Sequence, residues 1–217
     1  MALIRSVFQD ELDNVSQSLV DLTEMVSTAM TKATSAILNC DLKLAEEVIA
    51  NDEIIDNYQH DIDSRIIDII ARQQPVASDL RALVTALRMG SDLERMGDLA
   101  HHVAKLARLR HPDSAIPSDL IQTVTDMGRV AVALTTKTGV VIATRDTEMA
   151  MQVERDDDEM DDLHRKLIGI LIEPNWKYGI ETAIDLTLLG RYYERYADHA
   201  VSISRRVYFL VTGKFAS

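Results

Sequence analysis

The sequence predicts an all-α protein of six helices, arranged as two pseudo-symmetric three-helix bundles. Its composition favours long helices, because 47% of the 217 residues are apolar and only eight Gly and four Pro are present. Apolar residues recur every three or four positions, and alternation of polar and apolar residues is never long enough to indicate a sheet. A duplicated acidic motif divides the chain into two similar parts.

The duplication consists of two repeated sets of residues. A Glu-Arg-x-x-Asp motif occurs twice, at an offset of 100 residues, as Glu94, Arg95 and Asp98 and again as Glu194, Arg195 and Asp198. A second set recurs at an offset of 105 residues: Asp41, Ala45, Val48, Asp52 and Asp56 match Asp146, Ala150, Val153, Asp157 and Asp161. Two sets of matching residues between the halves indicate two copies of one helical unit. We therefore expect one unit over residues 1–112 and a second over residues 113–217.

The first unit has three predicted helices. The first covers residues 3–38 and ends near Asp41, whose side chain can cap the second helix. The second helix ends before Pro75, because proline disfavours helical geometry at the residue that precedes it. The third begins at Ser78 or Asp79 and ends in the segment RHPDSAIPSD, which holds two of the four prolines.

The second unit repeats this order after Ser118. Its periodicity predicts helices over roughly residues 120–144, 147–172 and 176–211. Gly213 follows the last of them at a position where glycine often ends a helix. The two units together give six helices.

Charge and cysteine usage exclude several classes of protein. Asp and Glu number 35 against 23 Lys and Arg, and a net charge of -12 repels the backbone of nucleic acids. Acidic residues occur near the start of the sequence, before any apolar run long enough for a signal peptide. The sequence also has no stretch of about 18 apolar residues that would predict membrane insertion. A single cysteine, Cys40, suits a reducing compartment. We therefore expect a soluble, cytoplasmic protein.

Four pairs of carboxylates lie one helical turn apart. They are Asp52 with Asp56, Glu94 with Asp98, Asp157 with Asp161, and Glu194 with Asp198. Carboxylates at this spacing repel each other. In each unit, both pairs follow the apolar line of their helix, so the pairs of the second and third helices are expected to face each other. A hard multivalent cation offsets such repulsion, and the pattern therefore predicts one metal site in each unit.

The opposite face of the third helix is expected to be solvated. It carries Arg81, Arg88, Asp92 and Arg95. Arg95 and Arg195 could instead neutralise the acids, and ordinary surface salt bridges on a plain helical scaffold remain an alternative to a metal. Three histidines within a turn of the acids, His101, His102 and His199, could add nitrogen ligands or simply be partly exposed.

The sequence lacks the common catalytic signatures. It has no GxxxxGK loop, no CxxC pair and no glycine-flanked serine elbow, which argues against an enzyme. The acid clusters leave one enzymatic alternative, a carboxylate-bridged dimetal oxidase or phosphatase. However, the Glu-x-x-His motif of ferritin-like dimetal proteins does not occur.

The duplicated motifs resemble those of the PhoU family, the accessory and regulatory protein of the phosphate-specific transport system. The resemblance covers the whole chain, from SVFQDELDNV through NDEIID, DLERMGDLA, RDDDEMD and YERYADHAVSI to VYFLVTGK. It implies a PhoU-like fold of two three-helix bundles, metal clusters of iron or zinc type on the bundle surfaces, and a homodimer. It also implies a non-catalytic adaptor between the ATPase subunit of the phosphate ABC transporter and a sensor histidine kinase, which restrains phosphate-starvation signalling and limits uptake.

By motif position, the resemblance assigns metal ligands to both units. They are Asp52, Asp56, Glu94 and Asp98 in the first, and Asp157, Asp161, Glu194 and Asp198 in the second. Arg95 and Arg195 are expected to orient these carboxylates. The copies differ where His199 replaces Leu99 and Tyr192 replaces Asp92, so the two metal sites are expected to differ as well.

Overall fold

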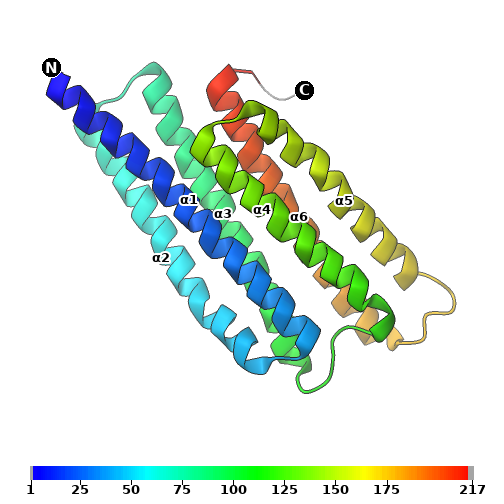
Figure 1. Cartoon of the computed structure of the whole chain (residues 1–217). Helices are drawn as coiled ribbons and strands as arrows, with labels where there is room; N and C mark the ends of the chain where they lie inside the picture. Colours follow the sequence, from blue (N-terminus) through cyan, green and yellow to red (C-terminus); the bar gives the residue numbers. More distant parts are fainter. Residues whose placement is uncertain (1, 215–217) are drawn as a thin grey trace.

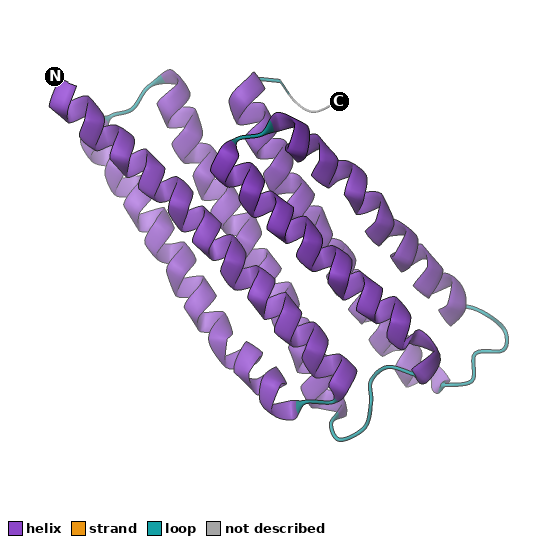
Figure 2. Cartoon of the chain, viewed as in Figure 1, coloured by secondary structure: helices purple, strands orange, loops and turns teal. Residues whose placement is uncertain are grey.

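The computed structural model of the chain describes the backbone of residues 2–214 and the side chains of residues 8–214. Within these residues it has six long helices and no strand, which confirms the predicted all-α fold (Figure 2). The elements are α1 (Ala2–Asn39), α2 (Leu42–Gln73), α3 (Ala77–Arg110), the short 3-10 helix η1 (Ser118–Leu120), α4 (Ile121–Thr144), α5 (Thr147–Leu171) and α6 (Gly179–Thr212).

The turns between the first two helices of each repeat are alike. Asp41 caps α2 by accepting a hydrogen bond from the backbone of Leu44 at 3.0 Å, as predicted, and Asp146 caps α5 in the same way. The residue before each cap, Cys40 or Arg145, has a positive φ of 53° or 56°. The offset of 105 residues in the sequence therefore corresponds to a repeated turn.

The last helix begins later than predicted. We expected it to start at Trp176, but α6 starts at Gly179. Gly179 has a φ of +82°, in the left-handed region, and a right-handed helix does not continue through such a residue. Trp176 lies in the preceding loop, where its indole Nε1 donates a hydrogen bond to the carbonyl of Gly179 at 2.7 Å. Gly213 ends α6 in the left-handed conformation, as predicted.

The six helices form two sets of three that lie side by side (Figure 1). α1, α2 and α3 pack together as the first repeat, and α4, α5 and α6 as the second. The repeats meet where α1 packs on α4 and α3 packs on α6, which leaves α2 and α5 on the outer sides. The buried apolar side chains form one cluster that extends through both repeats. The division of the chain at residues 112 and 113 stays a prediction.

Two tyrosines of α6 bind the repeats together. Tyr193 and Tyr196 are the largest fully buried side chains among the residues described, and both reach α1. The hydroxyl groups of Tyr193 and Thr34 lie 2.7 Å apart, and Tyr196 donates a hydrogen bond to the carbonyl of Val26 at 3.1 Å. Burial raises the pKa of both tyrosines, so both hydroxyls stay protonated. The contact combines large apolar burial with satisfied polar atoms.

Candidate functional site

The acids of the first repeat gather between α2 and α3. α2 supplies Asp52 and Asp56, and α3 supplies Glu94 and Asp98. Gly97 permits the close approach of the two helices, because a Cβ atom there would lie only 3.0 Å from Cγ2 of Ile55. All four carboxylates are partly buried.

These carboxylates lie close enough to disfavour one another's charge. Burial raises the pKa of Asp56, and the negative charges of Asp52 and Asp98 raise it further. The pKa of Glu94 is also raised by burial, then by Asp98, Asp56 and Asp52, although the charge of Arg95 acts against them. The predicted meeting of the two acid pairs is therefore present in the geometry of the first repeat.

His101 completes this cluster. Its Nδ1 hydrogen-bonds with Asp52, whose side chain is only 14% exposed. The other ring nitrogen, Nε2, is buried and has no hydrogen-bond partner among the residues that the structure describes, and the same is true of Oδ1 of Asp56. A carboxylate that holds the Nδ1 proton leaves Nε2 with a free lone pair, the arrangement in which histidine binds metals.

The second repeat places its acids in the same way. Asp157 and Asp161 come from α5, and Glu194 and Asp198 come from α6. Burial raises the pKa of Asp157 to about 7, and Asp161, Asp198 and Glu194 contribute in that order. Asp161 is exposed, whereas the other three side chains are partly buried.

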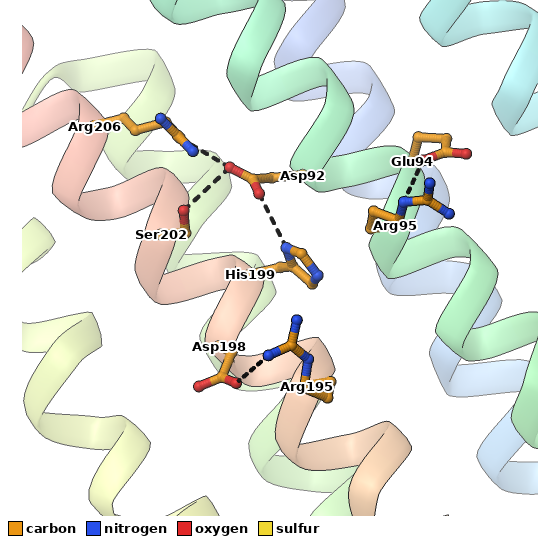
Figure 3. A network of polar contacts seen from close by, with 8 residues as sticks. All are labelled: Asp92, Glu94, Arg95, Arg195, Asp198, His199, Ser202 and Arg206. Atoms are coloured by element: carbon orange, nitrogen blue, oxygen red, sulfur yellow. Dashed lines mark hydrogen bonds and ion pairs between the residues drawn. The ribbon is translucent and has the colours of Figure 1, made fainter.

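Arginines compete for half of the predicted ligands. Arg95 donates a hydrogen bond to Asp98 at 2.6 Å. Arg95 also lies 3.5 Å from Glu94, and Arg195 lies 3.6 Å from Asp198 (Figure 3). Glu194 is paired with an arginine that the sequence did not single out, Arg191, at 2.5 Å. These guanidinium groups are largely solvent-exposed, with 61% of the Arg95 side chain accessible. Such exposed pairs contribute little to stability.

The acids of α2 and α5 are not neutralised in this way. Asp52, Asp56, Asp157 and Asp161 have no ion pair with lysine or arginine within residues 8–214. Over the same residues, no group of three or more His, Cys, Asp or Glu side chains is already arranged around a metal position. The clusters contain oxygen donors and, in the first repeat, an unpartnered imidazole nitrogen, but among the residues that this structure describes these donors do not surround a metal position.

The three candidate histidines have different surroundings. Only His101 lies in an acid cluster. His102 stacks on Tyr192 of α6, with ring centroids 5.2 Å apart, and His199 hydrogen-bonds with Asp92 across the repeats. His102 and His199 therefore serve the contact between α3 and α6.

Asp92 was predicted to be on a solvated face, and this was wrong. Its side chain is only 14% exposed and accepts hydrogen bonds from His199 at 3.0 Å, Ser202 at 3.2 Å and Arg206 at 2.9 Å (Figure 3). Burial alone raises the pKa of Asp92, but the hydrogen bonds and charges of His199 and Arg206 outweigh it, so the pKa is lowered. Asp92 is a charged anchor between the repeats.

A signal for this anchor was present in the sequence. Two of the positions at which the copies of the motif differ are Asp92 against Tyr192 and Leu99 against His199. In the structure, Asp92 contacts Ser202 while Tyr192 contacts His102, and these two contacts exchange when 100 is added to or subtracted from each residue number. These two differences between the copies thus lie where α3 and α6 meet around the pseudo-twofold axis.

Comparison with known proteins settles the family. A family model described as the PhoU domain matches residues 19–107 and 124–207. The chain belongs to the PhoU family. The resemblance expected from the duplicated acidic motifs is thereby confirmed.

The PhoU relatives match along almost the whole chain. The chain is 44% identical over 212 residues to the phosphate-specific transport system accessory protein PhoU homolog 2 of Mycobacterium tuberculosis, with 98% of this chain and 100% of that protein covered. It is 31% identical to a PhoU homolog of Rhizobium meliloti, with 98% and 90% covered. These proteins are named as accessory proteins rather than enzymes.

Solved PhoU structures share the fold. The crystal structure of the phosphate transport system regulatory protein PhoU from Streptococcus pneumoniae matches with a TM-score of 0.88 and 25% identity, over 97% of this chain and 99% of that one. PhoU from Pseudomonas aeruginosa matches with a TM-score of 0.84 and 28% identity, over 95% and 100%. Among the helices described for this chain, none is long and apolar enough to cross a membrane.

Proposed function

We propose that this PhoU-family chain is an accessory and regulatory protein of a phosphate-specific transport system. It works in the cytoplasm, where it links the ATPase subunit of the phosphate ABC transporter to a sensor histidine kinase. By this link it restrains phosphate-starvation signalling and limits phosphate uptake when phosphate is plentiful. The observation that carries the proposal is the 44% identity over the full length of an accessory protein with that name.

The alternative of a dimetal oxidase or phosphatase has less support. The relatives are named as accessory or regulatory proteins, which agrees with the prediction that the chain is not an enzyme. The acid clusters lie between helices at the outer sides of both repeats, between α2 and α3 and between α5 and α6, where a partner protein can reach them. A structural or docking role suits this placement.

A gene deletion tests the regulatory function. We expect a strain without this protein to express phosphate-starvation genes in phosphate-rich medium, and expression of the wild-type chain from a plasmid to restore repression. Unchanged expression after deletion would remove the regulatory part of the proposal. Pull-downs of the tagged chain at high and low phosphate test the link, and they should recover the transporter ATPase subunit and the histidine kinase.

Each acid cluster is proposed to hold a multivalent metal ion of iron or zinc type. In the first repeat, Asp56, Glu94 and Asp98 would bind through oxygen and His101 through Nε2, while Asp52 holds the imidazole in orientation. In the second repeat, Asp157, Asp161, Glu194 and Asp198 provide oxygen donors. The bound ion would supply the positive charge that cancels the repulsion among these carboxylates.

This assignment makes the two sites chemically different. The residue that corresponds to His101 in the second repeat is Val201, so α6 supplies no imidazole there. A mixed nitrogen and oxygen site suits zinc or iron, whereas a site of oxygen ligands alone suits harder ions.

A homodimer is also part of the proposal, on the strength of family resemblance. Sedimentation equilibrium of the purified chain tests it. A mass of one chain at micromolar concentration, with and without added zinc or iron, would contradict the dimer.

A further inference from the structure

A cavity of about 430 Å³ lies between the two repeats, at the end of the molecule where α1 and α3 begin and α4 and α6 end. The upper part of Figure 1 shows these four helix ends together. The floor of the cavity is apolar and is formed by both repeats: Leu12, Val15, Leu83, Met89, Ile142 and Val207.

The opposite end of the same four-helix seam is closed. There the linker between α3 and α4 buries the side chains of Ala115, Ile116 and Leu120. The linker is held by His111, which hydrogen-bonds with the carbonyl of Cys40, and by Tyr178, which donates to Asp119. The pseudo-twofold symmetry relates the two ends of the seam to each other. Within the described part of the chain, only the first end has the cavity, because the linker fills the other.

Two arginines line the cavity without a carboxylate partner. Neither Arg81 nor Arg145 has an ion pair with any residue for which the structure describes a side chain. Arg81 lies over the ring of Phe209 with 5.7 Å between Cζ and the ring centroid, and Arg145 follows α4 with a left-handed backbone. One carboxylate, Asp79, also lines the cavity, so its lining holds two positive charges and one negative charge; Asp13 lies beside Arg145 in an adjoining hollow.

This local excess of positive charge contrasts with the negative net charge of the chain. The net charge is -12, and arginines elsewhere, such as Arg95, Arg110 and Arg206, are paired with acids. Ligand sites in proteins are commonly apolar cavities of about 300–1,000 Å³ with a few polar groups that fix orientation. The cavity has this size and this combination of groups.

We propose that the cavity binds a small aliphatic anion. Its hydrocarbon tail lies against the apolar floor between the repeats, and its carboxylate or phosphate head is held by Arg81 and Arg145. This site is separate from the acid clusters and does not depend on the proposed role in phosphate regulation.

Calorimetric titration of the full chain with four ten-carbon probes tests the chemistry. We expect decanoate and decyl phosphate to bind, and 1-decanol and decylamine to bind at least about tenfold more weakly, because they lack the charge that the arginines recognise. Tighter binding of one of the two anions identifies the natural head group. Equal binding of all four probes would overturn the proposal.

Variants locate the site. Ala82→Trp places a large side chain at the wall of the cavity and should weaken decanoate binding at least about tenfold. Arg145→Gln should weaken decanoate but leave decanol unchanged, and the matched control Arg88→Gln, which alters an exposed arginine of α3 outside the cavity, should change neither. Circular dichroism checks folding, and Arg145→Gln, at an exposed position, decides the matter if the Ala82 variant does not fold. Wild-type affinity for decanoate in both Ala82→Trp and Arg145→Gln would show that decanoate binds elsewhere.

Discussion

His199 of α6 hydrogen-bonds with Asp92 of α3 at 3.0 Å between Nδ1 and Oδ1, which joins the two repeats through a partly buried charge (Figure 3). The guanidinium of Arg206 also donates a hydrogen bond to this carboxylate, at 2.9 Å. Removing the carboxylate would leave Arg206 without its counter-charge and His199 without its hydrogen-bond partner at the interface, and this is costly in a partly buried site.

Asp92→Asn should therefore destabilise the protein. We expect the free energy of unfolding to fall by about 1–3 kcal/mol, because an amide keeps the shape but not the charge that holds His199 and Arg206. Urea denaturation followed by circular dichroism measures this change. Asp162→Asn removes an exposed acid paired with Arg165 and serves as the control, with an expected change within about 0.5 kcal/mol. Equal effects of the two substitutions would contradict the anchor role of Asp92.

The metal-free protein should lose stability as the pH rises through the titration of Asp157. The pKa of this acid is raised from 3.8 in the unfolded chain to about 7 in the folded one. Between about pH 4 and pH 7 the folded state therefore binds the proton more tightly, and the free energy of unfolding decreases across this window and then levels off.

Asp157→Asn tests this cause. At pH 8 and without metal, the variant should be more stable than the wild type by about 1–2 kcal/mol, after allowance for solvent screening of a half-buried group. Near about pH 3, below both pKa values, the acid is largely protonated in both states and the difference should become small. Thermal melts in chelator-treated buffer give both values, and a constant difference at all pH values would exclude a titration effect.

Metal content should separate the two acid clusters. His101→Ala removes the free imidazole of the first repeat and should lower the zinc or iron retained after dialysis by the amount that one site holds. Glu194→Ala should remove the metal held by the second repeat. Elemental analysis of each variant measures the metal, and His102→Ala is the control, since His102 stacks on Tyr192 outside the clusters. Metal-free wild-type protein after purification without chelator and reloading would defeat the assignment.

Loss of the hydroxyl of Tyr193 should cost about 1 kcal/mol, because the buried hydrogen bond with Thr34 disappears and Thr34 loses its partner. Urea denaturation of Tyr193→Phe provides the value. Combining it with Thr34→Val gives a double-mutant cycle, and we expect the two effects to be clearly non-additive. Simple additivity would show that the two hydroxyl groups do not interact.

The parts of the structure that depend on local periodicity were predictable. The six helices, the Asp41 cap and the grouping of Glu94 and Asp98 with Asp52 and Asp56 all follow from spacing along single helices and from the duplication. These features are repeated in the sequence, and each is a property of one repeat.

The features that depend on contact between the repeats were missed. A helical wheel of α3 assigns Asp92 to the solvated side, because within one repeat that side has no neighbour, yet α6 covers it. For the same reason, the sequence could not separate His102 and His199 from His101. The packing of α3 on α6 decides that His199 hydrogen-bonds with Asp92 and that His102 stacks on Tyr192.

The anchor at Asp92 also bears on how a doubled chain of this kind can evolve. Its pseudo-twofold contact between α3 and α6 has the form of an association between two identical half-length ancestors. After gene fusion each half became free to change alone, and Asp92 now needs His199 where its own half offers Leu99. Two copies of either half would each lack one partner of this contact, so neither half alone could rebuild it.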